Sequence, residues 1–320
     1  MLLSCGDALI DFIPERLDDG RGALLPTVGG SCLNIAVGMA RLGAPAGFVG
    51  GIATDFLGQM IAAHAVSSNV TLRYATRGAR QTTLAFVRMV DGEPHYAFYD
   101  EGTASRHWSY RKGSISFADI DAVHVGSTTL IHEETATQTY ALLADAQGAA
   151  TVSFDPNCRP NLISEKKAYV KRMESFAAHA DIVRMSDVDF AYMYESERHE
   201  AKARQWLAHN ASLVIITRGE RGVTAWHCGA GAVEVAAPRV TPVDTVGAGD
   251  SFQAALLVGL RMAERIAVPS LRDMTADELK RILTFAAACA ARTCERAGAN
   301  PPSRAELDPG LFALLRPSAA

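Results

Sequence analysis

The sequence predicts an α/β protein with a doubly wound, mostly parallel sheet, helices on both faces of that sheet, and a small β-sheet lid. Short apolar segments alternate along the chain with segments of helical period, which is the pattern of βαβ units. Several apolar segments lack polar alternation, as expected of strands that a parallel sheet buries on both faces. One region, residues 82–99, has two alternating runs instead, and it predicts the lid.

The strands and helices of the body are predicted from the residue types in each segment and from the period of its apolar residues. Strands are predicted over the apolar, β-branched segments 2–13, 47–52, 121–127, 151–155, 181–185 and 212–217. Helices are predicted over the periodic segments 31–43, 54–66, 134–148, 200–210, 251–260 and 275–298. Gly43 suits the position after a helix C-terminus, and Thr275 with Glu278 predicts a capping box.

The lid is predicted from two stretches. Residues 82–99 carry a hairpin signal at Asp91-Gly92, and residues 11–30 are extended and rich in turns. We therefore expect a single domain over residues 1–320, with a lid formed by about 12–28 and 82–110 that closes over the carboxyl ends of the strands. A surface hairpin without function is the alternative. The alternating runs leave an apolar face on a thin sheet, which predicts a homodimer joined through the lids.

Composition excludes several classes of partner. The 320 residues carry a net charge of -4, which gives no reason to expect nucleic acid or an anionic membrane. No apolar run approaches the ~20 residues needed to span a bilayer. The six cysteines form no C-x-x-C pair and are expected to be free thiols, and no signal peptide is recognised. We therefore expect a cytoplasmic protein.

The segment DTVGAGDSF, residues 244–252, predicts a reaction centre. Gly247, Ala248 and Gly249 would let the backbone approach a ligand, and their N–H groups could form an anion hole for a transferring phosphoryl group. Asp250 would sit in the first turn of the following helix and could accept a proton from an attacking hydroxyl. The alternative is a plain loop-to-helix turn whose acidic residue complements the helix dipole.

Two further groups of residues could bind small molecules. Gly29-Gly30 leads into a helix whose first turn carries Asn34, and Asn34 with strand-borne Asp11 could bind the neighbouring hydroxyls of a polyol. A strand ends at Thr217 before Gly219 and Gly222, where small residues leave room for a flat ring. The alternative for the first group is a helix start at which Asn34 is only solvated. The alternative for the second group is a plain hairpin turn. The G-x-x-x-x-G-K-[ST] loop is absent.

In this order the motifs resemble those of the ribokinase-like (PfkB) carbohydrate kinases over nearly the whole chain. Residues 244–252 look like the family's C-terminal signature, and G-G-x-x-x-N-x-A-x-x-x-A-R-L-G looks like its N-terminal one. The segments GDALIDFIP, AFYDEGTAS, DPNCRPNL and VRMSDVD resemble the fructokinase branch. The resemblance implies an ATP-dependent sugar kinase with Asp250 as the base.

Carried over by position, the resemblance implies three sets of binding residues. The sugar would be held by Asp11, Gly29, Gly30, Asn34, Phe98 and Arg159. The nucleotide would be bordered by Ser186, Thr217, Gly219, Gly222, Gly249 and Ala287. Mg²⁺ would be approached through water by Asp189, which stands where relatives usually carry Glu, and potassium is left open.

Two departures from the family pattern affect the expected ligands. Ala287 stands where such kinases often have Asn, which puts the nucleotide preference in doubt. Asp100 stands where fructokinases often have Arg. Fructose, phosphorylated at its 6-hydroxyl, is the first choice of substrate. The alternatives are 2-keto-3-deoxygluconate, which would need cations such as Arg88, Arg106 or Arg159, ribose, a nucleoside, or a non-catalytic sugar-binding regulatory role.

Overall fold

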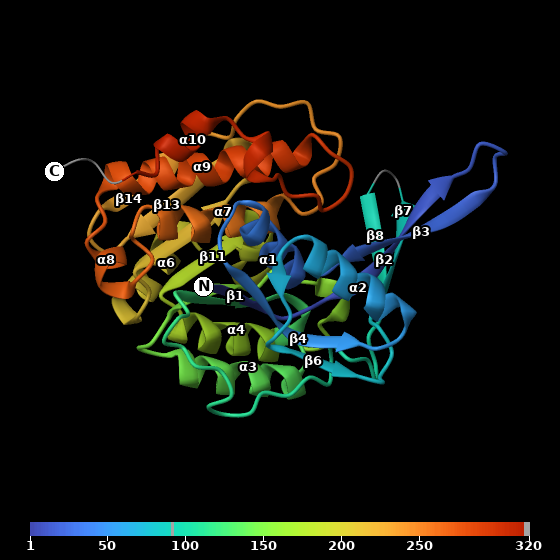
Figure 1. Ribbon diagram of the computed structural model, residues 1–320. Coiled ribbons are helices and arrows are strands. Elements are labelled where there is room, and N and C mark those ends of the chain that lie inside the picture. The colour runs from blue at the N-terminus through green and yellow to red at the C-terminus, as the bar shows by residue number, and fades with distance from the viewer. Residues whose placement is uncertain (91–92, 317–320) are drawn as a thin grey trace.

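In the computed structural model, which describes residues 1–90 and 93–316, the body is built on one ten-stranded sheet (Figure 1). From edge to edge its strands are β14 (Gly231–Val235), β13 (Val223–His227), β12 (Leu213–Thr217), β11 (Ile182–Ser186), β10 (Thr151–Asp155), β9 (Ala122–Gly126), β1 (Leu2–Cys5), β4 (Ala46–Ala53) and β5 (Val70–Thr71), with β6 (Ala75–Gly78) also paired to β4. All these pairs are parallel except β12–β13 and β13–β14.

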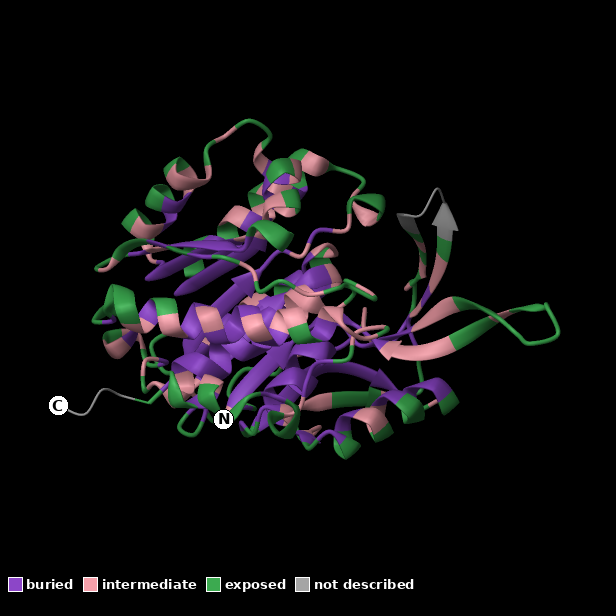
Figure 2. Cartoon of the chain, turned by 90° about the horizontal axis from the view of Figure 1, so that it is seen from above, coloured by how far each residue is buried: buried purple, intermediate pink, exposed green. Residues whose placement is uncertain are grey.

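Helices cover both faces of this sheet, and each face has its own hydrophobic core. One face packs against α1 (Ser31–Arg41), α2 (Phe56–Ser67), α7 (Ala248–Met262), α8 (Val268–Arg272), α9 (Ala276–Cys294) and α10 (Pro309–Ala313). The other packs against α3 (Glu133–Ala146), α4 (Lys166–His179), α5 (Asp187–Tyr194) and α6 (His199–His209). The predicted fold class is confirmed. Figure 2 shows the strands and the inner faces of the helices almost wholly buried.

The sequence signals for helix ends are confirmed. The capping box of Thr275 and Glu278 is present at the start of α9. Gly43 follows the end of α1 with a φ of 92°, a conformation that glycine adopts without strain.

A second sheet of four strands forms the lid, in the order β3 (Gly22–Gly29), β2 (Leu9–Arg16), β7 (Leu84–Val90) and β8 (Glu93–Tyr99). The β2–β3 hairpin projects away from the body (Figure 1), and much of the lid is exposed or half-buried (Figure 2). Asp91-Gly92, predicted as a turn, lies outside the described residues. After Tyr99 the chain forms no further lid strand, and Trp108 is buried in the core of the body.

The sequence interpretation was wrong at residues 2–13, which form two strands rather than one. β1 belongs to the body and β2 to the lid, and the chain turns between them at Gly6–Ala8. The apolar pattern continues across the junction because both strands bury side chains, although in different sheets. The antiparallel strands β13 and β14 and the helices α4 and α5 were not predicted.

The order of strands fixes the place of a binding site. β1 lies between β4 and β9, so the chain reverses its direction of travel across the sheet at β1. Crevices at such a reversal, beyond the carboxyl ends of the strands, are where ligands bind in open α/β sheets. No helix among the described residues is long and apolar enough to cross a membrane.

Candidate active site

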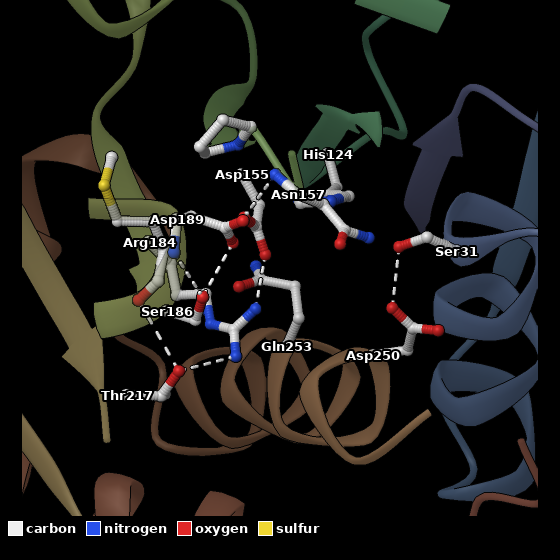
Figure 3. Close-up of polar contacts among 12 residues, drawn as sticks. Ser31, His124, Asp155, Asn157, Arg184, Ser186, Asp189, Thr217, Asp250 and Gln253 are labelled. Carbon is white, nitrogen blue, oxygen red and sulfur yellow. Dashed lines mark hydrogen bonds and ion pairs between the residues drawn. The ribbon is translucent and has the colours of Figure 1, made fainter. Parts of the chain in front are cut away.

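Polar side chains from three strand ends and one helix start lie near one another at the carboxyl edge of the sheet (Figure 3). Asp155, Ser186 and Thr217 are the last residues of β10, β11 and β12, and Asp250 lies in the first turn of α7. The lid adds Asp11 from β2. These residues, all predicted except Asp155, therefore come from distant parts of the sequence to one edge of the sheet.

Asp250 is held by the first turn of α1. Its carboxylate accepts a hydrogen bond from Ser31 Oγ at 2.6 Å (Figure 3). It accepts another from Asn34 Nδ2 at 2.9 Å. Burial raises the pKa of Asp250, while these two donors and the charge of Arg159 oppose the rise. A partly desolvated carboxylate with two fixed donors keeps lone pairs free for a substrate hydroxyl. Asn34, predicted to hold the sugar, thus also orients the predicted base.

The glycines before Asp250 are required by close packing. Gly247 has a φ of 76°, and a Cβ there would lie 2.7 Å from the Cα of Ala299. The N–H of Ala248 donates to the carbonyl of Thr245, so it is already used. The N–H groups of Gly249 and Asp250 have no acceptor among the described residues, as is normal in a helix first turn. The N–H group of Gly247 likewise has no acceptor among the described residues, so free donors lie within the predicted anion hole as well as just after it, and the anion hole stays a prediction.

Asp11 occupies the lid side of the site. Burial raises its pKa to about 6, the nearby Asp7 carboxylate adds to the rise, and Arg159 opposes it. Gly29 makes this position possible, because a Cβ there would lie 2.1 Å from Asp11 Oδ2. Gly30, at a φ of 103°, packs equally closely on the backbone of Asp7 and Ala8. The two glycines thus bring the lid carboxylate up to the start of α1.

Arg159 is the cation whose charge acts on both Asp11 and Asp250. It donates to the carbonyl and side-chain oxygens of Asn157 and to the carbonyl of Cys158, and it forms no ion pair among the described residues. Asn157 has a positive φ of 39°, which marks a tight turn after β10. The guanidinium stabilises the ionised forms of Asp11 and Asp250 and can also receive an anionic group.

Two residues at the base of the lid, Phe98 and Asp100, have partners that the sequence did not reveal. Phe98 stacks on Tyr96, with ring centroids 6.0 Å apart. Asp100 does not leave an isolated negative charge near the sugar: it accepts from His132 Nε2 at 2.8 Å and pairs with Arg106 at 3.4 Å. The hydrogen bond from His132 holds the pKa of Asp100 below its usual range.

The predicted nucleotide residues come from the ends of β11 and β12, the turn after β12, the start of α7 and the middle of α9. Thr217 ends β12, and Gly219 and Gly222 follow it with positive φ values of 55° and 84°. Ala287 is only 8% exposed within α9 and offers no polar atom there. Thr217 Oγ1 accepts a hydrogen bond from Arg184 at 2.8 Å, which links the end of β12 to β11.

Ser186 and Asp189 form a compact pair at the start of α5. Ser186 Oγ donates to Asp189 Oδ2 at 2.8 Å and accepts from the Asp189 N–H, while the Cys158 N–H donates to Asp189 Oδ1 at 3.0 Å. Burial and the charge of Asp155 raise the pKa of Asp189. Each of its oxygens keeps a lone pair that water could use.

Four residues of the site were missed from the sequence: Ser31, Asp7, Asp155 and Arg184. Asp7 accepts from the Cys32 N–H and from Ser127 Oγ, which joins β1 to α1 and β9. Arg184 pairs with Asp155 and donates to Thr217 Oγ1 at 2.8 Å. A charged residue inside a strand expected to be buried on both faces is the signal that could have found Arg184. Ser31 carries no such signal, because serine is common where helices begin.

Comparison with known proteins gives a consistent result. Residues 1–306 match the family described as pfkB family carbohydrate kinase. A fructokinase of Rhizobium leguminosarum bv. trifolii is 40% identical over 263 residues, which is 82% of this chain and 80% of the relative. Fructokinase-2 of Solanum lycopersicum is 32% identical over 315 residues, covering 94% and 92% of the two chains.

The solved structures agree with these relatives. The crystal structure of a fructokinase from Xylella fastidiosa with bound ATP superposes with a TM-score of 0.87 at 28% sequence identity, covering 98% of this chain and 97% of that one.

Proposed function

The chain belongs to the pfkB family of carbohydrate kinases, and we propose that it transfers the γ-phosphoryl group of ATP to the primary 6-hydroxyl of fructose. One observation carries the proposal: a partly desolvated carboxylate, Asp250, lies in the first turn of a helix whose N–H groups are free to bind an anion. The relatives named fructokinase and the ATP-bound neighbour support the choice of both substrates.

The chemistry follows from this arrangement. Asp250 accepts the proton of the 6-hydroxyl, whose oxygen attacks the γ-phosphorus while the bond from that phosphorus to the β–γ bridging oxygen breaks. ADP leaves with the electron pair of that bond, and the products are the sugar phosphate, ADP and one proton. Free N–H groups at the start of α7 stabilise charge on the transferring group. Asp11 and Asn34 hold the neighbouring hydroxyls and so orient the 6-hydroxyl.

The residues present also fit Mg²⁺, the metal ion that we propose as a cofactor. Mg²⁺ bound with ATP would neutralise phosphate charge, and Asp189 would hold it through water. No cluster of three or more ligand side chains occurs among the described residues, as suits a metal carried mainly by phosphates. Potassium stays open. All six cysteines are free, which supports the proposed cytoplasmic location.

The substrate assignment is strengthened by Asp100. Because its carboxylate is hydrogen-bonded to His132 and paired with Arg106, its negative charge no longer argues against fructose. An acid substrate such as 2-keto-3-deoxygluconate would rely on Arg159, since Arg106 is paired and Arg88 is exposed on the lid. Ribose or a nucleoside would need no such cation, and either would compete with fructose for the hydroxyl-binding groups Asp11 and Asn34.

A coupled ADP-release assay over fructose, ribose, 2-keto-3-deoxygluconate and a nucleoside tests activity and substrate together. We expect the highest kcat/KM with fructose and no turnover in excess EDTA. Asp250→Asn should lower kcat by ~10² to 10⁴-fold while fructose still binds, because removing a general base typically has that effect. Wild-type kcat in Asp250→Asn would show that the base is wrongly assigned. Sugar binding without any turnover in the wild type would favour a regulatory role.

A further inference from the structure

A buried arginine lies beside the anion-binding end of α7. Arg184, in the middle of β11, is 6% exposed. Its terminal nitrogens lie 3.2 Å and 3.3 Å from the position that a Cβ on Gly249 would take. Its guanidinium also lies 5.7 Å from the ring centroid of Phe252, in the same helix. Arg184 and Asp250 therefore flank the same helix start (Figure 3).

The guanidinium has more donors than its protein partners use. One terminal nitrogen donates to Asp155 and the other to Thr217 Oγ1 at 2.8 Å. The Nε atom is buried and has no acceptor among the described residues. A guanidinium has five N–H donors, so this side chain keeps the capacity to bind further oxygen atoms.

A contribution to folding stability is a weak explanation for a buried arginine at position 184. Removing an ion pair from water costs about as much as its attraction returns, and apolar pairs of similar size are often at least as stable. The pair with Asp155 also leaves the Nε donor unsatisfied, which adds a desolvation cost that a purely structural pair would avoid. A phosphate group of the nucleotide would supply the acceptors that the Arg184 guanidinium lacks, and this would explain why an arginine is buried here.

We propose that Arg184 is a second charged group of the phosphoryl-transfer site, whose guanidinium binds the phosphate chain of the nucleotide and stabilises charge on the transferring group. This proposal rests on the proposed kinase function. Arg184 neither gains nor loses a proton, and the bonds that form and break are those already described. Thr217, which accepts from Arg184, would fix the guanidinium between the nucleotide turn and the start of α7.

The test compares variants that differ only in the cation. Asp155→Asn removes the negative charge of the buried partner. Adding Arg184→Met to that variant then removes the cation without leaving a buried carboxylate unpaired. The matched control is Asp121→Asn against Asp121→Asn/Arg261→Met, because Arg261 pairs with Asp121 at 2.8 Å at the opposite end of the same helix. For each protein we would measure kcat with fructose, the melting temperature, and the Kd of adenosine and of the ATP analogue with a β–γ imido bridge.

Loss of the cation should lower kcat by ~10² to 10³-fold relative to Asp155→Asn, the range for a lost charge-stabilising donor. The imido analogue should bind at least ~10-fold more weakly, as expected of a lost charge-assisted hydrogen bond, while adenosine binding is unchanged. The control pair should show neither effect. Equal loss for adenosine and analogue, or a kcat equal to that of Asp155→Asn, would overturn the proposal.

A second comparison covers the case in which the double variant does not fold. Arg184→Lys keeps the charge and Arg184→Gln keeps only hydrogen bonding, so the lysine variant should retain at least ~10-fold more kcat. Equal kcat in the two variants would overturn the proposal. A wild-type protein that phosphorylates no sugar would refute the proposed function, whereas the binding of the imido analogue would still decide the role of Arg184.

Discussion

Ser31 sets the ionisation of the proposed base. Its hydroxyl donates to Asp250 at 2.6 Å and stabilises the charged carboxylate against burial. Ser31→Ala should therefore raise the pKa of Asp250 further, so that less of the base is ionised at any given pH. The acidic limb of the profile of kcat/KM against pH should move to higher pH, with activity recovering in alkaline buffer.

The neighbouring serine of α7 supplies the control. Ser251 is equally buried, but its hydroxyl donates to the carbonyl of Cys289 and not to Asp250. Ser251→Ala should leave the acidic limb in place. An unmoved limb in Ser31→Ala would mean that its hydroxyl does not tune Asp250.

The ionised side chain of Asp11 should lower the stability of the folded protein and raise its affinity for sugar. Because its pKa rises from 3.8 to about 6 on folding, the folded protein binds the proton more tightly than the unfolded chain. The protein therefore loses stability as pH rises through this range, and the loss persists above it. Asp11→Asn should raise the melting temperature above pH ~7 but change it little below pH ~4.

The same variant should weaken sugar binding. Charge-assisted hydrogen bonds contribute ~1.5–3 kcal/mol each, so kcat/KM for fructose should fall by roughly tenfold to several hundredfold per bond. Fructose analogues that lack the contacted hydroxyls should lose much less. A uniform loss for all analogues together with a lower melting temperature would mean that Asp11 only supports its strand.

Sequence reasoning picked out candidate residues that lie in local motifs. It missed residues whose contacts are with distant parts of the chain. Asp250 and Gly247 could be placed at a helix start because glycines lead there into an apolar run of helical period, and α7 begins at that point, while their roles stay predictions. Arg184 and Ser31 acquire their meaning only from Asp155, Thr217 and Asp250, which are distant in sequence. No local pattern contains such a pairing.

At the scale of single elements, β3 controls the position of Asp11. A methyl group on Gly29 would lie 2.1 Å from Asp11 Oδ2, so Gly29→Ala should displace the carboxylate while leaving the lid folded. We expect the KM for fructose to rise by at least ~10-fold with little change in kcat, because the lost bonds are mainly to bound sugar.

Gly22→Ala is the matched control, because it lies in the same strand and a Cβ there meets no described atom within 4 Å. It should leave both constants unchanged. Equal effects of the two substitutions would show that β3 acts through lid stability rather than through Asp11.

Elements with strong local signals were predicted well, as α9 with its capping box shows. The junction of β1 and β2 could not be predicted, because the same apolar pattern serves two sheets and only tertiary pairing separates them. The β13–β14 hairpin was likewise missed at the edge of a sheet whose other strands are parallel.

At the scale of the whole molecule, one face of the lid is apolar and partly exposed. Strand alternation and pairing place Phe12, Leu24, Phe86 and Tyr99 on the face opposite Asp11. Leu24 and Tyr99 are 47% and 62% exposed, and Phe12 stacks on Phe86 at 4.8 Å. We expect two copies to bury this face against one another under two-fold symmetry.

Light scattering at micromolar concentration should therefore give the mass of a dimer. Leu24→Glu should yield a monomer, because a charge would have to be buried within the apolar face. Leu314→Glu, at an exposed leucine near the C-terminus, should remain dimeric. A monomeric wild-type protein would contradict the prediction.

The short junction between β1 and β2 carries Asp7 and leads to Asp11 in the lid, and the charge of Asp7 helps to raise the pKa of Asp11. Hydroxyl donors of a bound sugar favour the ionised form of Asp11, whose free pKa is about 6. Sugar binding near that pH should therefore release protons to the buffer. The calorimetric heat of binding should vary with the ionisation enthalpy of the buffer, and Asp11→Asn should remove that variation.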